Sequence, residues 1–173
     1  MTNPKQAEES TDAFIVIGGN LGQARATVLA AIEALAQLPQ TLLTARSPLY
    51  GSAPLGVNAD GPTYVNAVAQ LHTRLSADEL LSELHRIERH YGRERTYKNA
   101  ARTLDLDILL YGDTVMHTDT LTIPHPRLHD RAFVLYPLFD LKPDISWHNA
   151  LGQRVSARDL KIYVADQDIT QLD

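Results

Sequence analysis

The chain contains no cysteine and only one tryptophan and three phenylalanines among its 173 residues. The absence of cysteine excludes disulfide bonds, thiol nucleophiles and zinc sites built on thiolates. No Gly-Lys dipeptide occurs, which excludes a Walker phosphate-binding loop, and the zinc-protease pattern His-Glu-x-x-His is absent as well. Any catalytic site must therefore use other groups, chiefly carboxylates, guanidiniums and imidazoles.

Long apolar runs and basic tracts are also missing. No stretch is long enough to predict a transmembrane helix, and the first dozen residues lack the basic start and apolar core of a signal peptide. We expect a disordered tail at residues 1–12, a single domain at residues 13–173, and a cytoplasmic protein without a membrane partner. The net charge of −5, with no basic tract, argues against nucleic acid as the main partner.

The segment from Arg102 to Leu110 alternates polar and apolar residues, which predicts a half-buried β-strand. Asp105 and Asp107 would share one face, and the other face would carry four apolar residues: Leu104, Leu106, Ile108 and Leu110. Two like charges on a strand repel each other and aspartate is a poor strand former, so folding alone gives no reason for the pair. Binding of Mg²⁺ would explain the pair, because Mg²⁺ binds one or two carboxylates together with water and substrate phosphates.

A competing interpretation places both aspartates on the solvated face of an edge strand, where they discourage aggregation. Nearby cationic side chains favour a phosphoryl-transfer site instead, because such sites combine carboxylates that hold metal with groups that hold phosphates. The nearby groups are Arg93, Arg95, Arg102, His125 and Arg131.

The periodicity along the chain predicts an α+β fold. We expect a glycine turn at residues 18–22, a long loop at residues 51–62, a short helix near residues 130–139, and these main elements: strands Ala13–Ile17, Thr41–Leu49, Tyr64–Leu71 and 104–110, and helices Ala24–Leu38 and Ser76 to about Tyr91. Ser76 and Glu79 form a predicted capping box. The order βαββαβ is the ferredoxin-like arrangement, an antiparallel sheet with both helices on one face and the other face open to ligands.

Six blocks in order along the chain resemble the 6-hydroxymethyl-7,8-dihydropterin pyrophosphokinases, enzymes of folate biosynthesis. The blocks are Phe14-Ile-Val-Ile-Gly-Gly-Asn-Leu-Gly22, Tyr50-Gly-Ser-Ala-Pro-Leu-Gly56, Tyr64-Val-Asn-Ala67, Ile87-Glu88 with Gly92-Arg93, Arg102-Thr-Leu-Asp-Leu-Asp-Ile-Leu, and Pro124-His125 with Arg131-Ala-Phe133. Three positions depart from the family pattern: Gly19 replaces a serine, Asn99-Ala-Ala-Arg102 replaces Trp-Gly-Pro-Arg, and Thr120 replaces an arginine.

The resemblance implies a monomeric enzyme that moves pyrophosphate from ATP to the hydroxymethyl group of the pterin and releases AMP. It implies two Mg²⁺ ions on Asp105 and Asp107, with Arg93 and Arg102 as further catalytic residues. The implied ATP-binding residues are Glu88, Arg93, Arg95, Arg102, Ile108, Thr122, His125 and Arg131. The implied pterin-binding residues are Ser52, Leu55, Tyr64, Asn66 and Phe133.

The chemistry of the side chains agrees with the pterin assignments. An asparagine offers both a donor and an acceptor to the edge of a pterin ring, and Tyr64 and Asn66 share one face of a strand. Alternatives stay open, because Tyr64 and Phe133 could be core aromatics and Glu88 a solvated helix charge. The arginines could likewise be surface charges.

Two other functions also stay open. A non-catalytic or drifted ferredoxin-like paralogue could bind a nucleotide or a pterin, although it would need no metal pair. A metal-dependent phosphohydrolase or glycosyl transferase could use Asp-x-Asp, but would not explain Tyr64 and Asn66. Because the loop at residues 93–102 lacks the family's Trp-Gly-Pro, we expect it to be mobile until ATP, Mg²⁺ and pterin are bound.

Overall fold

The computed structural model describes residues 9–20, 23–52, 64–91 and 104–172. Helices and antiparallel strands are mixed, as an α+β fold requires. The elements are β1 (Thr11–Gly19), α2 (Ala24–Ala36), β2 (Thr41–Arg46), β3 (Tyr50–Ser52), β4 (Tyr64–Thr73), α3 (Ala77–Tyr91), β5 (Leu104–Tyr111), β6 (Met116–His117), β7 (Thr122–Ile123), η1 (Leu128–Asp130), α4 (Ala132–Leu141), β8 (Ser146–His148), β9 (Arg154–Ser156), α5 (Ala157–Lys161), η2 (Ile162–Val164) and β10 (Ile169–Gln171).

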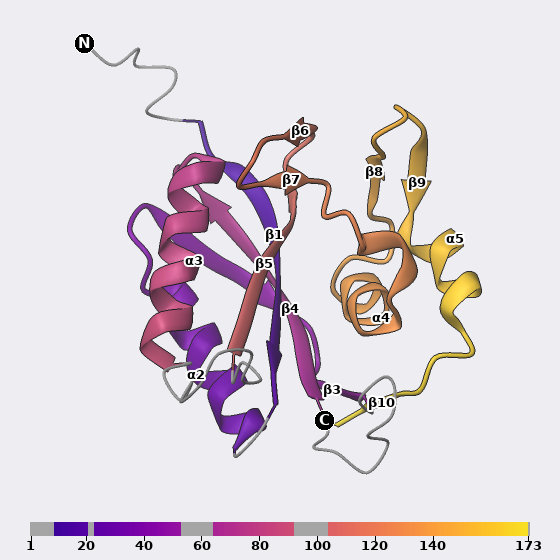
Figure 1. Cartoon of the computed structure of the whole chain (residues 1–173), viewed down its shortest axis with the longest axis horizontal. Helices are drawn as coiled ribbons and strands as arrows, with labels where there is room; N and C mark the ends of the chain where they lie inside the picture. The colour runs from indigo at the N-terminus through magenta and orange to yellow at the C-terminus, as the bar shows by residue number, and fades with distance from the viewer. Residues whose placement is uncertain (1–8, 21–22, 53–63, 92–103, 173) are drawn as a thin grey trace.

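The main sheet follows the order β10–β3–β4–β1–β5, and β2 also pairs with β4. Every pairing in it is antiparallel. Helices α2 and α3 lie on one side of the sheet, whereas α4, α5 and the β8–β9 hairpin lie on the other (Figure 1). The sheet therefore sits between two layers, and both of its faces are at least partly covered.

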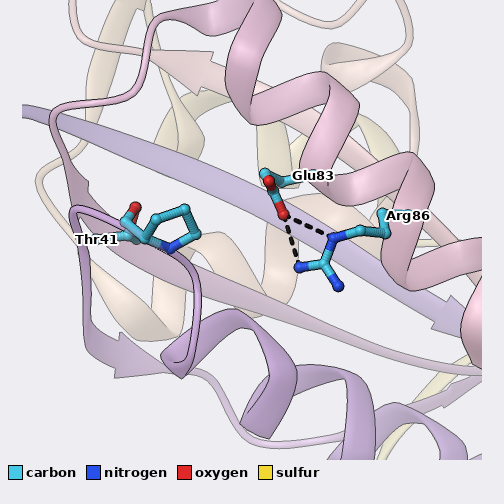
Figure 2. Close-up of polar contacts among 4 residues, drawn as sticks. Thr41, Glu83 and Arg86 are labelled. Atoms are coloured by element: carbon cyan, nitrogen blue, oxygen red, sulfur yellow. Dashed lines mark hydrogen bonds and ion pairs between the residues drawn. The ribbon is translucent and has the colours of Figure 1, made fainter.

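Helix α3 begins as the sequence predicts. The Ser76 backbone N–H donates to Glu79 Oε1 at 3.0 Å, and the Glu79 backbone N–H donates to Ser76 Oγ at 3.1 Å, so the capping box is confirmed. Along the side of this helix, Arg86 donates to Glu83 Oε2 through Nε and Nη2 at 2.9 and 2.7 Å (Figure 2). Such a surface pair at i,i+3 contributes only a few tenths of a kcal/mol, roughly 0.3–0.5, to the helix.

The core between the sheet and helices α2 and α3, the helix-side core, confirms most of the expected strand alternation. Leu104, Leu106 and Ile108 are almost fully buried there against residues of α2 and α3. The expectation that Leu110 shares this face is wrong, because Leu110 joins the second core, on the face covered by α4. The pairing with β1 shifts between Ile15, opposite Ile108, and Phe14, opposite Leu110, so β5 carries one extra residue at Leu109. Such a bulge reverses the alternation beyond it.

The second core also corrects the expectation of an open ligand face. Phe14, Val16 and Val68 pack on that face against α4 residues such as Leu135 and Leu138. The part of the face where β1 ends and β4 and β5 begin is not built into this core, and it carries the polar residues of interest. The candidate site is therefore confined to one end of the sheet.

Several boundaries differ from the sequence prediction. Gly18 and Gly19 continue β1 instead of forming a turn, since both pair with β4 and β5. The predicted strand Thr41–Leu49 ends at Arg46 as β2, and a separate short strand, β3, begins at Tyr50 and continues into the predicted loop. The C-terminal region, which showed only a weak pattern, forms the β8–β9 hairpin, α5 and β10. In the part of the chain that the structure describes, no helix combines the length and apolar character needed to cross a membrane.

Candidate active site

Three strands bring Asn66, Gly18 and Asp105 into one row across the sheet. Gly18 of β1 lies opposite Asn66 of β4 on one side and opposite Asp105 of β5 on the other. Residues directly opposite one another share a face, and neighbouring strands are about 4.8 Å apart, so the backbones of Asn66 and Asp105 lie about 10 Å apart. The predicted pterin-binding and metal-binding residues therefore face the same region.

Gly18, in the middle of this row, has no side chain. A Cβ atom added there would lie 2.8 Å from Oδ1 of Asn66, closer than real Cβ contacts allow. The amide of Asn66, whose residue is 5% exposed, therefore lies over the backbone of β1. The glycine is required by this close approach and adds no side chain of its own between Asn66 and Asp105.

Asp105 and Asp107 are both exposed on β5, as their alternation predicted. Glu88 of α3 is close to them: its carboxyl shares a hydrogen bond with Asp105 and accepts one from the backbone N–H of Leu106. Burial raises the pKa of Glu88 to about 7, and the charges of Asp105 and Asp107 add to the effect. The three carboxyl groups thus crowd negative charge into one place, an arrangement that a cation relieves.

The sequence leaves two interpretations of Glu88, an ATP-binding residue and a solvated helix charge. The structure places Glu88 against Asp105 and Leu106, so it is not a freely solvated charge. Among the residues that the structure describes, no group of three or more His, Asp or Glu side chains is arranged as a complete metal site. Asp105 and Asp107 would therefore need water and substrate oxygens to complete a cation's shell, which is how Mg²⁺ is usually bound.

We expect the chain without divalent cations to lose stability as the pH rises from about 4.5 to about 7. Glu88 has its pKa raised from 4.5 to about 7 in the folded state, so the native state binds the proton more tightly than the unfolded state across this window. The loss should be roughly 2 kcal/mol, since solvent reduces the full effect. Urea unfolding at several pH values, in EDTA, measures it.

Two variants complete this experiment. Glu88→Gln should flatten the pH dependence over the window, whereas Glu83→Gln, which changes a carboxylate paired with Arg86 on the same helix, should leave it unchanged. Equal slopes for the unaltered chain and Glu88→Gln would show that Glu88 does not titrate in this range.

His125 lies at the phosphate end of the predicted site. Its Nε2 is 3.9 Å from Oδ2 of Asp107, and its Nδ1 accepts the backbone N–H of Arg127 at 3.1 Å. Burial lowers the pKa of His125, and the charges of Arg131 and Arg127 lower it further against the opposing charge of Asp107. A neutral imidazole whose Nδ1 accepts must carry its proton on Nε2, so His125 presents an N–H donor on the side of Asp107.

Helix α4 carries Phe133 near its start, and Arg131 immediately precedes the helix. The guanidinium carbon of Arg131 lies 5.3 Å from the centroid of the Phe133 ring, a cation–π contact. Phe133 is partly buried against the second core, so part of its surface is packed and part is not. Helix α4 therefore brings one predicted phosphate-binding and one predicted pterin-binding residue together.

The remaining predicted site residues differ in their exposure and contacts. Tyr64 is 38% exposed at the start of β4, so it is not a core aromatic, and Ser52 pairs with it from β3. Thr122 shares a hydrogen bond with Nδ1 of His117 at 2.9 Å. Ile108 is 2% exposed in the helix-side core, so only its backbone could contact ATP. Four predicted residues lie outside the described residues: Leu55, Arg93, Arg95 and Arg102.

Sequence reasoning missed two features of this region. Gly18 was assigned to a turn, although its place in the row with Asn66 and Asp105 depends on strand register. The contact between Tyr50 of β3 and Asp140 of α4 joins residues that are far apart in the sequence. A glycine inside an apolar strand pattern was the one available signal, because it often marks close approach of another group.

Comparison with known proteins identifies the family. The model of the 7,8-dihydro-6-hydroxymethylpterin-pyrophosphokinase (HPPK) family matches residues 14–143. The chain belongs to this family. The HPPK resemblance that the motifs indicated is therefore confirmed.

Curated HPPK relatives cover most of the chain. A 2-amino-4-hydroxy-6-hydroxymethyldihydropteridine pyrophosphokinase of Haemophilus influenzae is 46% identical over 138 residues, which are 80% of this chain and 86% of the relative. The protein of the same name from Pseudomonas aeruginosa is 48% identical over 132 residues, 76% of this chain and 81% of the relative.

Solved structures agree with the fold. A crystal structure of Plasmodium falciparum HPPK-DHPS superposes with a TM-score of 0.68 at 16% identity, covering 91% of this chain and 45% of that one. This chain thus spans less than half the length of that protein, and a likeness at this level of identity concerns the fold alone.

Proposed function

We propose that the chain transfers the β,γ-pyrophosphoryl group of ATP to the hydroxymethyl oxygen of 6-hydroxymethyl-7,8-dihydropterin and releases AMP, a step in folate synthesis. Membership of the HPPK family supports this activity. The structural observation that carries it is the row in which Gly18 separates Asn66 from Asp105. One ligand lying across β1 could contact the Asn66 amide, which would bind the pterin edge, and the metal-binding carboxylate of Asp105 at the same time.

The reaction joins the hydroxymethyl oxygen to the β-phosphorus and breaks the bond from that phosphorus to the oxygen that leaves with AMP. Little covalent chemistry is needed from the protein, so catalysis depends on positioning and on compensation of charge. The residues at this end of the sheet supply both. Asn66 and Tyr64 of β4 lie on one side of Gly18 and would contact the pterin, whereas Asp105 and Asp107 of β5 lie on the other side and would face the phosphates.

Asp105 and Asp107 are the residues that would hold two Mg²⁺ ions. Their exposed carboxylates on one strand face, crowded by Glu88, fit the oxygen ligands that this cation prefers. Bound Mg²⁺ would neutralise phosphate charge and ease deprotonation of the attacking hydroxyl. Glu88 would position Asp105 through their shared hydrogen bond.

Other residues would bind the charged part of ATP. His125 offers its Nε2–H beside Asp107, and Arg131 adds a cation at the start of α4. The family motifs assign Arg93, Arg95 and Arg102 to the phosphates and Leu55 to the pterin, and these assignments stay predictions. The expected ordering of residues 93–102 on ligand binding also lies outside the described residues.

We further propose a ferredoxin-like core for this chain. The order of elements β1–α2–β2–β4–α3–β5, with strands arranged as β2–β4–β1–β5, supports it. Our expectations of a single domain after a disordered tail, a monomer and a cytoplasmic location stay predictions.

The deciding experiment measures AMP formed from ATP and Mg²⁺ with and without 6-hydroxymethyl-7,8-dihydropterin. The proposal expects AMP only when the pterin is present, together with an equal amount of the pyrophosphorylated pterin. Binding of ATP or pterin without AMP formation would instead support a non-catalytic paralogue. Release of inorganic phosphate without the pterin would indicate a phosphohydrolase.

Gly18→Ala should weaken pterin binding because the new methyl group would displace the Asn66 amide, whose Oδ1 lies 2.8 Å from that position. We expect the Kd for 6-hydroxymethylpterin to rise on the order of tenfold, since small displacements of positioning groups have large effects. Isothermal titration in the presence of a non-hydrolysable ATP analogue measures it.

Gly152→Ala is the matched control. Gly152 has a φ of +78° and no atom within 4 Å of an added Cβ, and it lies between β8 and β9. Its replacement should lower the melting temperature without changing pterin affinity. Unchanged affinity in Gly18→Ala would show that Asn66 adapts freely or does not contact the pterin.

A further inference from the structure

Tyr50 flanks the predicted pterin-reading residue. It is the first residue of β3, lies directly opposite Asn66 of β4, and is 6% exposed. Opposite residues of an antiparallel pair share a face, with Cβ atoms about 5 Å apart. Tyr50 therefore belongs to the same row as Asn66, Gly18 and Asp105.

The side chain of Tyr50 also reaches α4. Its hydroxyl donates a hydrogen bond to Oδ2 of Asp140, and its ring lies 6.5 Å from the ring of Tyr136 at an interplanar angle of 49°. Asp140 lies two helical turns, about 10 Å, beyond Phe133 on the same helix. Helix α4 thus carries both Phe133, a predicted pterin-binding residue, and Asp140, the acceptor for the Tyr50 hydroxyl.

Strand β3 is short enough to need such an anchor. It has three residues, paired with β4 on one side and with the C-terminal strand β10 on the other. Its last residue, Ser52, is itself a predicted pterin contact and pairs with Tyr64. Lys161 of α5 also contacts this part of helix α4, since its Nζ lies 4.6 Å from the ring centroid of Tyr136.

We propose that the Tyr50–Asp140 hydrogen bond positions the pterin site by setting the separation between the sheet row that carries Asn66 and the helix that carries Phe133. This inference rests on the proposed function. A pterin bound at its edge by Asn66 and contacted by Phe133 is sensitive to the separation of these two residues, because a gap of about 1 Å already forfeits much of the van der Waals attraction. Tyr50 and Asp140 would be positioning residues that do not touch the reacting atoms.

The protonation state of the pair suits this role. Burial raises the pKa of Tyr50 well above its usual range, and the hydrogen bond to Asp140 and the charge of Asp140 add to this, so the hydroxyl remains a donor. The residue Asp140 is exposed. Removing the hydroxyl should therefore leave the carboxylate hydrated, and the fold should tolerate the variant.

The test compares Tyr50→Phe and Asp140→Ala with Tyr111→Phe as the matched control. Tyr111 of β5 also donates its hydroxyl, but to the backbone oxygen of Leu75 on the helix side of the sheet. The readouts are KM for each substrate, kcat, equilibrium binding of 6-hydroxymethylpterin with Mg²⁺ and a non-hydrolysable ATP analogue, and the melting temperature.

We expect Tyr50→Phe and Asp140→Ala each to raise the pterin KM and Kd roughly five- to tenfold, with the ATP KM within about twofold of the unaltered chain. The double variant should be no weaker than either single one, because both remove the same hydrogen bond. Asp140→Asn, which keeps an acceptor oxygen, should restore most of the affinity. Tyr111→Phe should change neither KM.

Two results would overturn the inference: pterin affinity unchanged in both Tyr50→Phe and Asp140→Ala, or KM values for both substrates rising together in these variants. A lower melting temperature with an unmoved ratio of the two KM values would show a structural role alone. If the unaltered chain binds no pterin, the proposed function itself fails, which separates that outcome from the first two.

Discussion

Replacing Asp105 or Asp107 by alanine is expected to reduce turnover by at least 10²- to 10³-fold, on the order found for removing one electrostatic contact in a transition state. Both carboxylates are exposed on β5, and Asp105 shares a crowded position with Glu88. They gain little from folding, because like charges on one strand face repel each other. Their proposed role is to hold the cation that compensates the charge of the triphosphate.

The same variants should stay folded, and Asp105→Ala should be at least as stable as the unaltered chain above pH 7. Removing the Asp105 charge takes away one of the groups that raises the pKa of Glu88. Coupled turnover assays with a Mg²⁺ titration and urea unfolding at pH 8 measure both effects.

Asp119→Ala is the control for this pair, since Asp119 is exposed and follows the β6 strand, away from the row. It should retain full turnover. Near-normal turnover of Asp105→Ala and Asp107→Ala at saturating Mg²⁺, or unfolding of both, would contradict the assignment.

Replacing Asn66 by alanine is expected to weaken pterin binding more than the loss of any single phosphate-binding cation does. An amide matches a donor and an acceptor on the pterin edge at once, and a buried edge group left unpaired costs roughly 1–3 kcal/mol, a five- to 150-fold rise in Kd. Asn66 is 5% exposed and fixed over Gly18, so water would not easily replace it.

Titration of 6-hydroxymethylpterin, with ATP affinity measured in parallel, tests this prediction. Arg131→Ala should mainly weaken ATP binding, and Gln70→Ala, farther along the same strand β4, should affect neither substrate. An Asn66→Ala variant that binds the pterin normally would remove Asn66 from the pocket and would leave the row across β1 without its proposed ligand.

Much of this protein is determined locally along its sequence. The alternation at residues 104–108 predicted which side chains of β5 are buried and that Asp105 and Asp107 are exposed together, as the structure confirms. The capping box of Ser76 and Glu79 predicted the start of α3. These features depend on residues two to four positions apart, where backbone geometry alone decides which side chains meet.

Other features depend on the tertiary structure. Strand register placed Gly18 between Asn66 and Asp105, and the bulge at Leu109 moved Leu110 to the second core. Packing of α3 on β5 brought Glu88 to Asp105.

The C-terminal region depends most on the tertiary structure. Its weak local pattern did not predict that α4 covers the second face of the sheet or that β10 pairs with β3. Register, bulges and layer contacts join residues dozens of positions apart. Their free energy comes from burial and pairing that exist only once the chain is folded, so no short stretch of sequence encodes them.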